Sequence, residues 1–160
     1  MPNANKPLLE SKVHPNWIDY NGHMYDASYA HVFSLAVDRL MTTIGIDHDF
    51  REKHQYTIYT LETHLRYLKE AYNGQEIHVT VQLLDHDTKR LHVFFVMKNK
   101  EGERLATSEQ MLMGINMKER RSAPFPESIV HSIIELAKAH EGAPIPDEAG
   151  QKIGIRRMKE

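Results

Sequence analysis

The stretch Trp17-Ile18-Asp19-Tyr20-Asn21-Gly22-His23-Met24 is followed almost at once by an amphipathic segment, residues 27–44. Apolar residues recur there at i, i+3, i+4 and i+7, which predicts a long helix with one buried face. These positions are Tyr29, Val32, Phe33, Ala36, Val37, Leu40, Met41 and Ile44. Asp26 is expected to cap the start of the helix and Gly45 to end it. So regular a stripe predicts that this helix is the central element of the fold.

Segments of alternating hydrophobicity after the long helix predict antiparallel strands joined by tight turns. The expected strands cover residues 57–68, 77–83, 91–97 and 104–117, and a short strand at 8–14 precedes the helix. A last helix is expected at 127–140, with the apolar set Ile129, Ile133, Ile134 and Leu136. A long helix followed by a strand meander predicts the α+β class, in one domain over residues 1–160, with the sheet wrapped around the helix.

The faces of the first long strand follow from its alternation. The apolar side chains expected on one face are Tyr59, Leu61, Leu65 and Tyr67, and those expected on the other are Glu62, His64 and Arg66. Glu62 and Glu109 lie inside predicted strands, where a buried carboxylate needs a partner. Two interpretations of Glu62 stay open: a structural ion pair with a neighbouring cation, or a carboxylate that faces a cationic substrate.

Composition narrows the function classes. The chain has 160 residues, 41% hydrophobic and 26% charged, with a formal net charge of -2, so neither nucleic acid nor an anionic membrane is expected as a partner. The absence of cysteine excludes disulfides and cysteine nucleophiles, and it fits a cytoplasmic location. No signal peptide or membrane span is predicted. The 11 histidines show no metal-site spacing, so a metal site is not expected.

The residues before the long helix bring several catalytic groups together. Asp19, Asn21 and His23 alternate in a turn with Gly22, directly before a predicted helix start. A carboxylate, an amide, an imidazole and unpaired backbone N–H groups can activate water and hold a developing oxyanion. A purely structural interpretation is that Asp19 and Asn21 shape the turn and that His23 caps the helix or packs against it.

This motif resembles the Asp-x-Asn-x-His stretch of hotdog-fold thioesterases of the 4-hydroxybenzoyl-CoA thioesterase type. Further segments are similar to the betainyl-CoA thioesterases of carnitine degradation. These segments are 15–24, Leu61-Glu62-Thr63-His64-Leu65-Arg66, Lys89-Arg90-Leu91-His92, 106–112 and Ile153-Gly154-Ile155-Arg156-Arg157. Many relatives carry two asparagines, or Asn and an acidic residue, after His-Met, where this chain has Tyr25-Asp26. The resemblance implies a hotdog fold and an acyl-CoA substrate that is hydrolysed without a cofactor.

The resemblance also implies roles for single residues. Asp19 is the candidate base or nucleophile, and Asn21 orients water or polarises the carbonyl. His23 contributes a side-chain donor, and its N–H or that of Met24 holds the oxyanion. Gly22 permits close backbone approach to a ligand. Glu70 corresponds to a glutamate that assists this set in plant acyl-carrier-protein thioesterases, although an exposed glutamate near a turn is an equal interpretation.

The expected substrate suggests a set of binding residues. A trimethylammonium group is recognised by aromatic faces. Candidates for such contacts are Trp17, Tyr20, Tyr25, Tyr56, Tyr59 and Tyr67, with core or loop packing as the alternative for each. Candidates for CoA phosphate contacts, or for a solvated rim, are Lys118, Arg120, Arg121, Arg156 and Arg157.

By resemblance, a homodimer or a dimer of dimers is expected, with sites at the subunit interface. A hotdog thioesterase for another short or branched acyl-CoA, or a non-catalytic acyl-CoA-binding module, are the alternatives.

Overall fold

The computed structural model describes residues 6–158. In chain order the elements are β1 (Leu9–Lys12), a 3-10 turn η1 (Pro15–Trp17), α1 (Asp26–Thr43), α2 (His48–His54), β2 (Tyr56–Tyr67), β3 (Glu76–His86), β4 (Arg90–Asn99), β5 (Arg104–Asn116), β6 (Arg121–Ser122) and α3 (Glu127–Ala139). The predicted α+β class, the long helix, the meander of long strands and the C-terminal helix are confirmed. The short helix α2 and strand β6 were not predicted.

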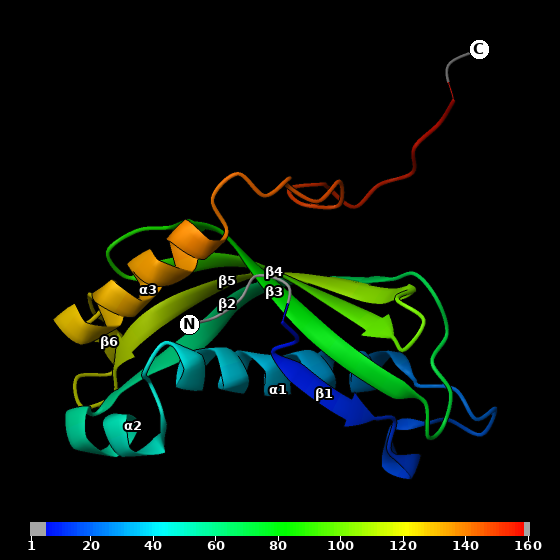
Figure 1. The fold of residues 1–160 in the computed structure, drawn as a ribbon, viewed down its shortest axis with the longest axis horizontal. Helices are drawn as coiled ribbons and strands as arrows, with labels where there is room; N and C mark the ends of the chain where they lie inside the picture. The colour runs from blue at the N-terminus through cyan, green and yellow to red at the C-terminus, as the bar shows by residue number, and fades with distance from the viewer. Residues whose placement is uncertain (1–5, 159–160) are drawn as a thin grey trace.

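The strands form one antiparallel sheet in the order β1-β3-β4-β5-β2, with β6 paired to the end of β5. Strand β2 pairs along its length with β5 and occupies one edge of the sheet. At the other edge, β1 covers only the Glu76 to Val79 part of β3, and within residues 6–158 no strand pairs with the rest of that side of β3. The sheet curls over α1, as Figure 1 shows. The face that packs on α1 is called the inner face below, and the opposite face the outer face.

The core lies between α1 and the inner face. Val32, Phe33, Ala36 and Leu40 of the helix are buried, and the rings of Phe33 and Phe95 lie 6.2 Å apart. Fully burying one such side chain contributes about 1.5–3 kcal/mol to folding. The apolar stripe of α1 therefore fixes the helix on the concave side of the sheet.

The ends of α1 differ in one detail from the prediction. The N-cap is Tyr25, and Asp26 is the first helical residue, whose Oδ1 accepts a hydrogen bond from the N–H of Ala27. The predicted cap was therefore one residue late, and the Asp26 carboxylate stands in the first turn, where negative charge is favourable. Gly45 follows the helix with φ +101, so the predicted stop is confirmed.

Helix α3 extends the core beyond the C-terminal end of α1. Ile129, Ile133 and Leu136 are buried, but Ile134 is 39% exposed, so its place in the predicted apolar set was wrong. The side chain of Ile129 approaches Gly45 so closely that a Cβ there would lie 3.2 Å from its Cδ1. His140, just after the helix, accepts a 2.9 Å hydrogen bond at Nδ1 from the N–H of Leu83.

A β-bulge changes the faces of β2. The register with β5 shifts between Thr60 and Glu62, so one extra residue separates the two halves of the strand. Tyr59 pairs with Met113 and Glu62 with Met111, which places both on the same face, since Met111 and Met113 are two residues apart. The prediction that Tyr59 shares a face with Leu65 and Tyr67 was therefore wrong.

The chain after α3 crosses the outer face of the sheet. Residues 141–151, called the strap below, lie on the side opposite α1 (Figure 1). Their contacts reach β3 through Gln82 and Pro144, then β5 through Arg104 and Glu148, and finally β2 through Arg66 and Gln151. Within residues 6–158, no helix is long and apolar enough to cross a membrane.

Candidate active site

The motif before α1 is a tight turn built around Asp19. Its Oδ1 accepts hydrogen bonds from the N–H of Asn21 at 2.8 Å and of His23 at 3.3 Å. Its main chain is bonded too, with the Gly22 N–H donating to the Asp19 carbonyl at 3.0 Å and the Asp19 N–H to the His23 carbonyl at 2.8 Å. Gly22 has φ +82, a conformation that favours glycine. The structural interpretation of Asp19 as an Asx-turn residue is therefore realised through one carboxylate oxygen.

The second oxygen of Asp19 is not used by the turn. Among residues 6–158, Asp19 Oδ2 has no hydrogen-bond partner, and the side chain is only partly buried. One oxygen thus fixes the orientation of the carboxylate while the other stays available to a ligand or a water. The structural and the catalytic interpretations of Asp19 are compatible.

The turn is held against the β2–β3 connection. The Met24 N–H donates to the Ala71 carbonyl at 2.8 Å, and His23 forms an antiparallel bridge with Tyr72. This pairing brings Glu70 beside the motif, with 3.6 Å between His23 Nε2 and Glu70 Oε2. The structure therefore brings Glu70 and His23 together, as the resemblance implied, although Glu70 is also exposed.

The backbone donors differ from the expectation. The Met24 N–H is paired with Ala71, and the His23 N–H points to Asp19 Oδ1. The prediction of Met24 as an oxyanion donor is therefore wrong for this arrangement, because its N–H is already used and the residue is buried. Within the part of the chain that the structure describes, the N–H of Asp26 at the start of α1 has no partner.

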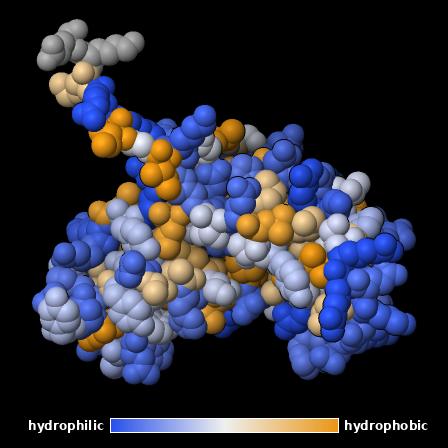
Figure 2. Space-filling model, turned by 180° about the vertical axis from the view of Figure 1, so that it is seen from behind, coloured by the Kyte–Doolittle hydropathy of each residue, from blue (hydrophilic) through white to orange (hydrophobic). Residues whose placement is uncertain are grey.

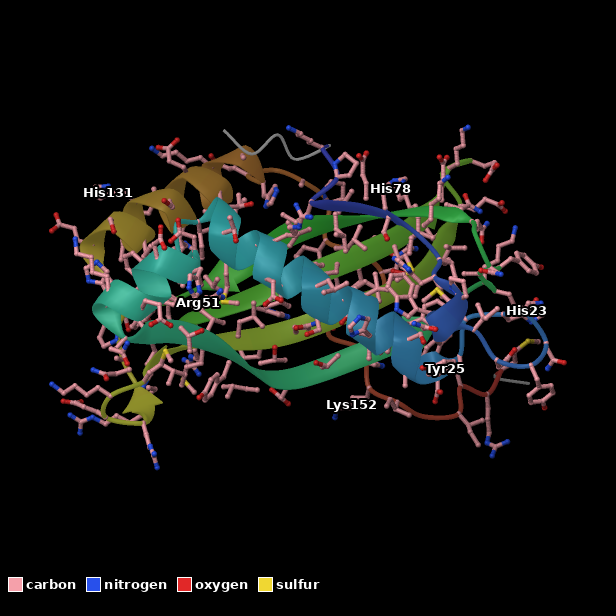
Figure 3. All side chains as sticks on the ribbon, turned by 90° about the horizontal axis from the view of Figure 1, so that it is seen from below. His23, Tyr25, Arg51, His78, His131 and Lys152 are labelled. Atoms are coloured by element: carbon pink, nitrogen blue, oxygen red, sulfur yellow. The ribbon has the colours of Figure 1, made fainter. Side chains whose placement is uncertain are left out.

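The aromatic candidates near the motif fall into two groups. Tyr20 is 97% exposed, and the exposed Tyr25 lies with His23 at the N-terminal end of α1 (Figure 3). Trp17 is half-buried, and its ring packs edge-on to His14 and His31 at 4.5 and 5.8 Å. The tryptophan therefore packs against its neighbours, whereas the two tyrosines are open to a ligand.

Two further aromatic features were missed at the sequence level. The ring of Tyr72 lies 4.9 Å from that of His23, and its hydroxyl is 3.5 Å from Glu70 Oε2. The rings of Tyr29 and Tyr67 pack edge-to-face at 5.2 Å beside the start of α1, where the Tyr67 hydroxyl donates to the Asp26 carbonyl. Burial raises the pKa of Tyr29, and burial together with the Asp26 charge raises the pKa of Tyr67. The phenols of Tyr29 and Tyr67 therefore stay neutral. Of these aromatic contacts, only that of Tyr72 had a signal in the sequence, its closeness to Glu70.

Several candidate residues do not join the motif within one protomer. Tyr59 and Glu62 stand on the outer face, because the bulge in β2 turns Tyr59 away from α1. Tyr56 is buried, and its hydroxyl donates to the Ala123 carbonyl at 2.9 Å. Glu109, the other strand-interior carboxylate, is also on the outer face, where its Oε2 lies 2.7 Å from His92 Nε2.

The basic candidates are also distant from the motif. Lys118, Arg120 and Arg121 follow the end of β5, which pairs with the start of β2, whereas the motif lies beside the opposite end of that strand. Arg156 lies on the outer-face side and donates to Gln151 Oε1 at 2.7 Å. Within residues 6–158, no group of three or more histidine, aspartate or glutamate side chains could hold a metal ion.

Comparisons with known proteins show the family to which the chain belongs. The model of the thioesterase-like superfamily matches residues 13–133. The betainyl-CoA thioesterase of Pseudomonas aeruginosa is 43% identical over 147 residues, covering 91% of this chain and 92% of that protein. An L-carnitine dehydrogenase/betainyl-CoA thioesterase of Agrobacterium fabrum is 39% identical over 153 residues, which are 96% of this chain and 31% of that protein.

A solved structure of a hypothetical protein from Staphylococcus aureus in complex with CoA is 38% identical, with a TM-score of 0.88, and covers 92% of this chain and 94% of that chain. Fold, motif and relatives together define a hotdog-fold thioester hydrolase. The chain belongs to the thioesterase-like superfamily. The resemblance to betainyl-CoA thioesterases is confirmed.

Proposed function

We propose that this protein hydrolyses betainyl-CoA to glycine betaine and free CoA, without a metal or redox cofactor. The observation that carries the proposal is the Asp19 turn beside His23 and Glu70, in a chain 43% identical to a betainyl-CoA thioesterase. The CoA complex of the Staphylococcus aureus relative supports an acyl-CoA substrate. A cytoplasmic location stays a prediction.

The reaction needs a nucleophile at the thioester carbonyl. Asp19 Oδ2 either removes a proton from the attacking water or attacks the carbonyl itself, and the geometry is compatible with both. When Asp19 acts as the base, the C–S bond then breaks and the CoA thiolate takes up the proton that Asp19 removed from water. When Asp19 attacks, the C–S bond breaks to leave a mixed anhydride on Asp19, and a water then hydrolyses the anhydride and supplies the proton to the thiolate. Asn21 orients the water or the carbonyl, and Gly22 lets the substrate approach the backbone closely. The unpaired Asp26 N–H at the start of α1 is the donor that can hold the developing oxyanion.

His23 and Glu70 form the second part of the proposed site. At 3.6 Å, Glu70 can orient the imidazole of His23 or accept a proton from it. His23 then serves as a donor to the substrate or to the departing thiolate. Glu70 acts on the chemical step through His23. Within residues 6–158, the side chains that contact Glu70 are those of His23 and Tyr72.

The betainyl headgroup carries a permanent positive charge. Aromatic faces attract such a group, and the exposed rings of Tyr20, Tyr25 and Tyr72 surround the motif. The Glu70 carboxylate stands next to Tyr72 and adds negative charge to the same place. These four residues form the proposed trimethylammonium subsite, in place of the Tyr59 and Glu62 expected from sequence.

The proposed site is completed by a second copy of the chain. Strand β2 is an edge strand of 12 residues, and Tyr59, Leu61 and Tyr67 on it are exposed. Seen from the β2 side, hydrophobic side chains gather in a hollow of the surface (Figure 2). A long exposed edge of this kind pairs readily with another strand. We therefore expect β2 to pair with β2 of a partner in a homodimer, or in a dimer of dimers.

The test is thiol release from betainyl-CoA and from its uncharged 3,3-dimethylbutyryl isostere. Asp19→Asn retains an oxygen that can accept the N–H groups of Asn21 and His23, so the turn should persist while the carboxylate is lost. We expect wild type to prefer betainyl-CoA and Asp19→Asn to lower kcat about 10²–10⁴-fold. Asp38→Asn, an exposed position on α1, is the matched control and should retain full turnover.

The outcomes separate the alternatives. Equal rates on both esters would reject the betainyl assignment and leave a thioesterase for another short acyl-CoA. Binding of CoA esters without turnover, in wild type and variant alike, would indicate a binding module. Full turnover by Asp19→Asn would reject the role of Asp19.

A further inference from the structure

The chain beyond the strap carries exposed apolar residues with no use in the proposed reaction. Residues 152–158, called the arm below, extend away from the body of the molecule (Figure 1). Ile153 is 90% exposed and Ile155 is 80% exposed. Gly154, between them, stands at a bend of the chain. The arm therefore presents two apolar side chains that are almost fully exposed within residues 6–158.

The base of the arm is fixed at the free edge of the sheet. Gln151 Oε1 accepts hydrogen bonds from Arg66 of β2 at 3.0 Å and from Arg156 of the arm at 2.7 Å. Lys152, the first arm residue, lies outside the ribbon of β2 in Figure 3. In Figure 2 the arm stands on the same side of the molecule as the hollow along β2. The arm thus leaves the protomer at the edge where a second copy is expected.

A receiving surface exists on the other half of β2. Tyr59 and Glu62 are exposed on the outer face, beside the partly buried Met111 and Met113. The hydrogen bonds of the strap end at Glu109 and Arg66, and its last residues, Gly150 and Gln151, line one pocket with Glu62 and Met111, whereas Tyr59 and Met113 lie outside that pocket. Within the described residues Glu62 has no ion pair, while the arm carries a cluster of cations, Lys152, Arg156 and Arg157. The surface and the arm therefore match in apolar character and in charge.

For Tyr59 the geometry favours a partner over the arm's own chain, whereas Glu62 lies only two residues from His64, which borders the arm of its own chain. Tyr59 lies seven residues before Arg66, or roughly 23 Å along the strand. When two β2 strands pair antiparallel about a two-fold axis through their middle, the first half of one strand lies beside the second half of the other. The partner's outer-face surface then adjoins the base of the arm.

We propose that the arm crosses to the second protomer, where Ile153 and Ile155 pack on Tyr59 of the partner subunit and the arm arginines approach Glu62 of the partner subunit. This inference rests on the dimer of the proposed function. It also assigns a place to Tyr59 and Glu62, which the catalytic site does not use.

The absence of cysteine permits a direct test by cross-linking. Ile155→Cys and Tyr59→Cys are made as separate full-length variants, one carrying a mass tag, and are co-expressed and mildly oxidised. We expect a disulfide between the two chains, formed about tenfold or more faster than in a control pair of Ile155→Cys with Ser34→Cys. Ser34 is exposed on α1, away from the outer face.

A second measurement does not depend on introduced thiols. Replacing Ile153 and Ile155 together by serine should raise the dimer dissociation constant about tenfold or more, since two apolar side chains lose their burial. Ile145→Ser, an exposed change on the strap, is the control and should leave that constant unchanged.

No cross-link above the control with an unchanged dissociation constant would overturn the arm contact, as would a monomeric wild type. Thiol release assayed on the same samples keeps the two proposals apart. Turnover without the cross-link rejects the arm contact alone, whereas the cross-link without turnover of any ester rejects the proposed function alone.

Discussion

The two faces of the sheet are held by different kinds of interaction. The inner face packs Leu91, Val93, Phe95 and Met97 of β4 against α1, and all four are fully buried. The outer face carries polar and charged side chains that contact the strap through hydrogen bonds and ion pairs, and one buried aromatic ring, Phe94 of β4. The carboxylate of Glu109, for example, accepts a hydrogen bond from the Gly150 N–H and pairs with the imidazole of His92.

We expect the two faces to have different roles: the inner face determines whether the chain folds, and the outer face determines how the strap is attached. Apolar burial is non-directional and contributes most of the stability, so the inner face should determine whether the chain folds. Hydrogen bonds and exposed ion pairs each contribute about 1 kcal/mol or less net, but they fix geometry. The outer face should therefore determine where the strap and the arm lie. Changes on the two faces should have effects of different size and kind.

The largest effect is expected on the inner face. Phe95→Ala removes a fully buried ring that packs against Phe33 and leaves a cavity. We expect a loss of about 3–5 kcal/mol in the free energy of unfolding, measured by urea denaturation. Phe95→Leu, which retains much of the volume, is the matched variant and should lose clearly less. Equal losses for both would mean that the site does not depend on packing.

The inner face is also the part that the sequence predicts well. The spacing of Val32, Phe33, Ala36 and Leu40 has only one regular solution, because a helix must bury such a stripe. The β2 faces were mispredicted, since a bulge at Leu61 leaves no mark in a two-residue alternation. The outer-face strap was not predicted either, because its contacts join residues such as Glu109 and Gly150 that no local pattern connects.

In the candidate site, too, the sequence predicts the local contacts but not the tertiary ones. The turn around Asp19 follows from local chemistry, since an aspartate two residues before a backbone N–H forms an Asx-turn readily. Glu70 was placed near the motif by resemblance, and the pairing of the loop with the β2–β3 connection supplies the physical reason. Tyr72 was missed because its contact with His23 depends on that same tertiary pairing.

The second-largest loss of stability is expected at His140, which follows α3 and contacts β3. Its Nδ1 accepts the Leu83 N–H, and burial lowers the pKa of the imidazole. His140→Ala should cost about 2–3 kcal/mol, because a buried N–H loses its acceptor. His140→Asn retains an acceptor and should cost less. Urea denaturation of the three proteins at pH 8 measures both differences.

The pH dependence of His140 has a definite sign. A lowered pKa means that the unfolded chain binds a proton more readily than the folded one, so wild-type stability falls as pH drops below about 6.5. His140→Asn has no such group, and its deficit relative to wild type should shrink between pH 8 and pH 5. A deficit that stays constant over this range would show that His140 does not remain neutral in the folded state.

A smaller effect is expected at the centre of the outer face. The Glu109 side chain is only 13% exposed, and Glu109→Ala leaves His92 and the Gly150 N–H without their partner. We expect a loss of about 1–2 kcal/mol and faster hydrogen exchange at Gly150. Glu109→Gln can still accept from Gly150 and should retain most of the protection. Thiol release by both variants should match wild type, because the strap lies across the sheet from Asp19.

The smallest effect is expected at the ion pair of Arg104 and Glu148. Its two bonds of 2.8 and 2.9 Å are bidentate, and the guanidinium of Arg104 lowers the pKa of Glu148. Arg104 is partly exposed, so Glu148→Gln should cost at most about 1 kcal/mol at pH 7. The lowered pKa makes this contribution present above the ordinary value of about 4.3 and lost as pH falls through the folded value. Wild type and Glu148→Gln should therefore converge in stability as pH falls below that ordinary value. If Glu148→Gln lost more free energy of unfolding at pH 7 than Glu109→Ala, the strap would be attached chiefly by charge. The outer face would then contribute to folding stability on the scale expected of the inner face.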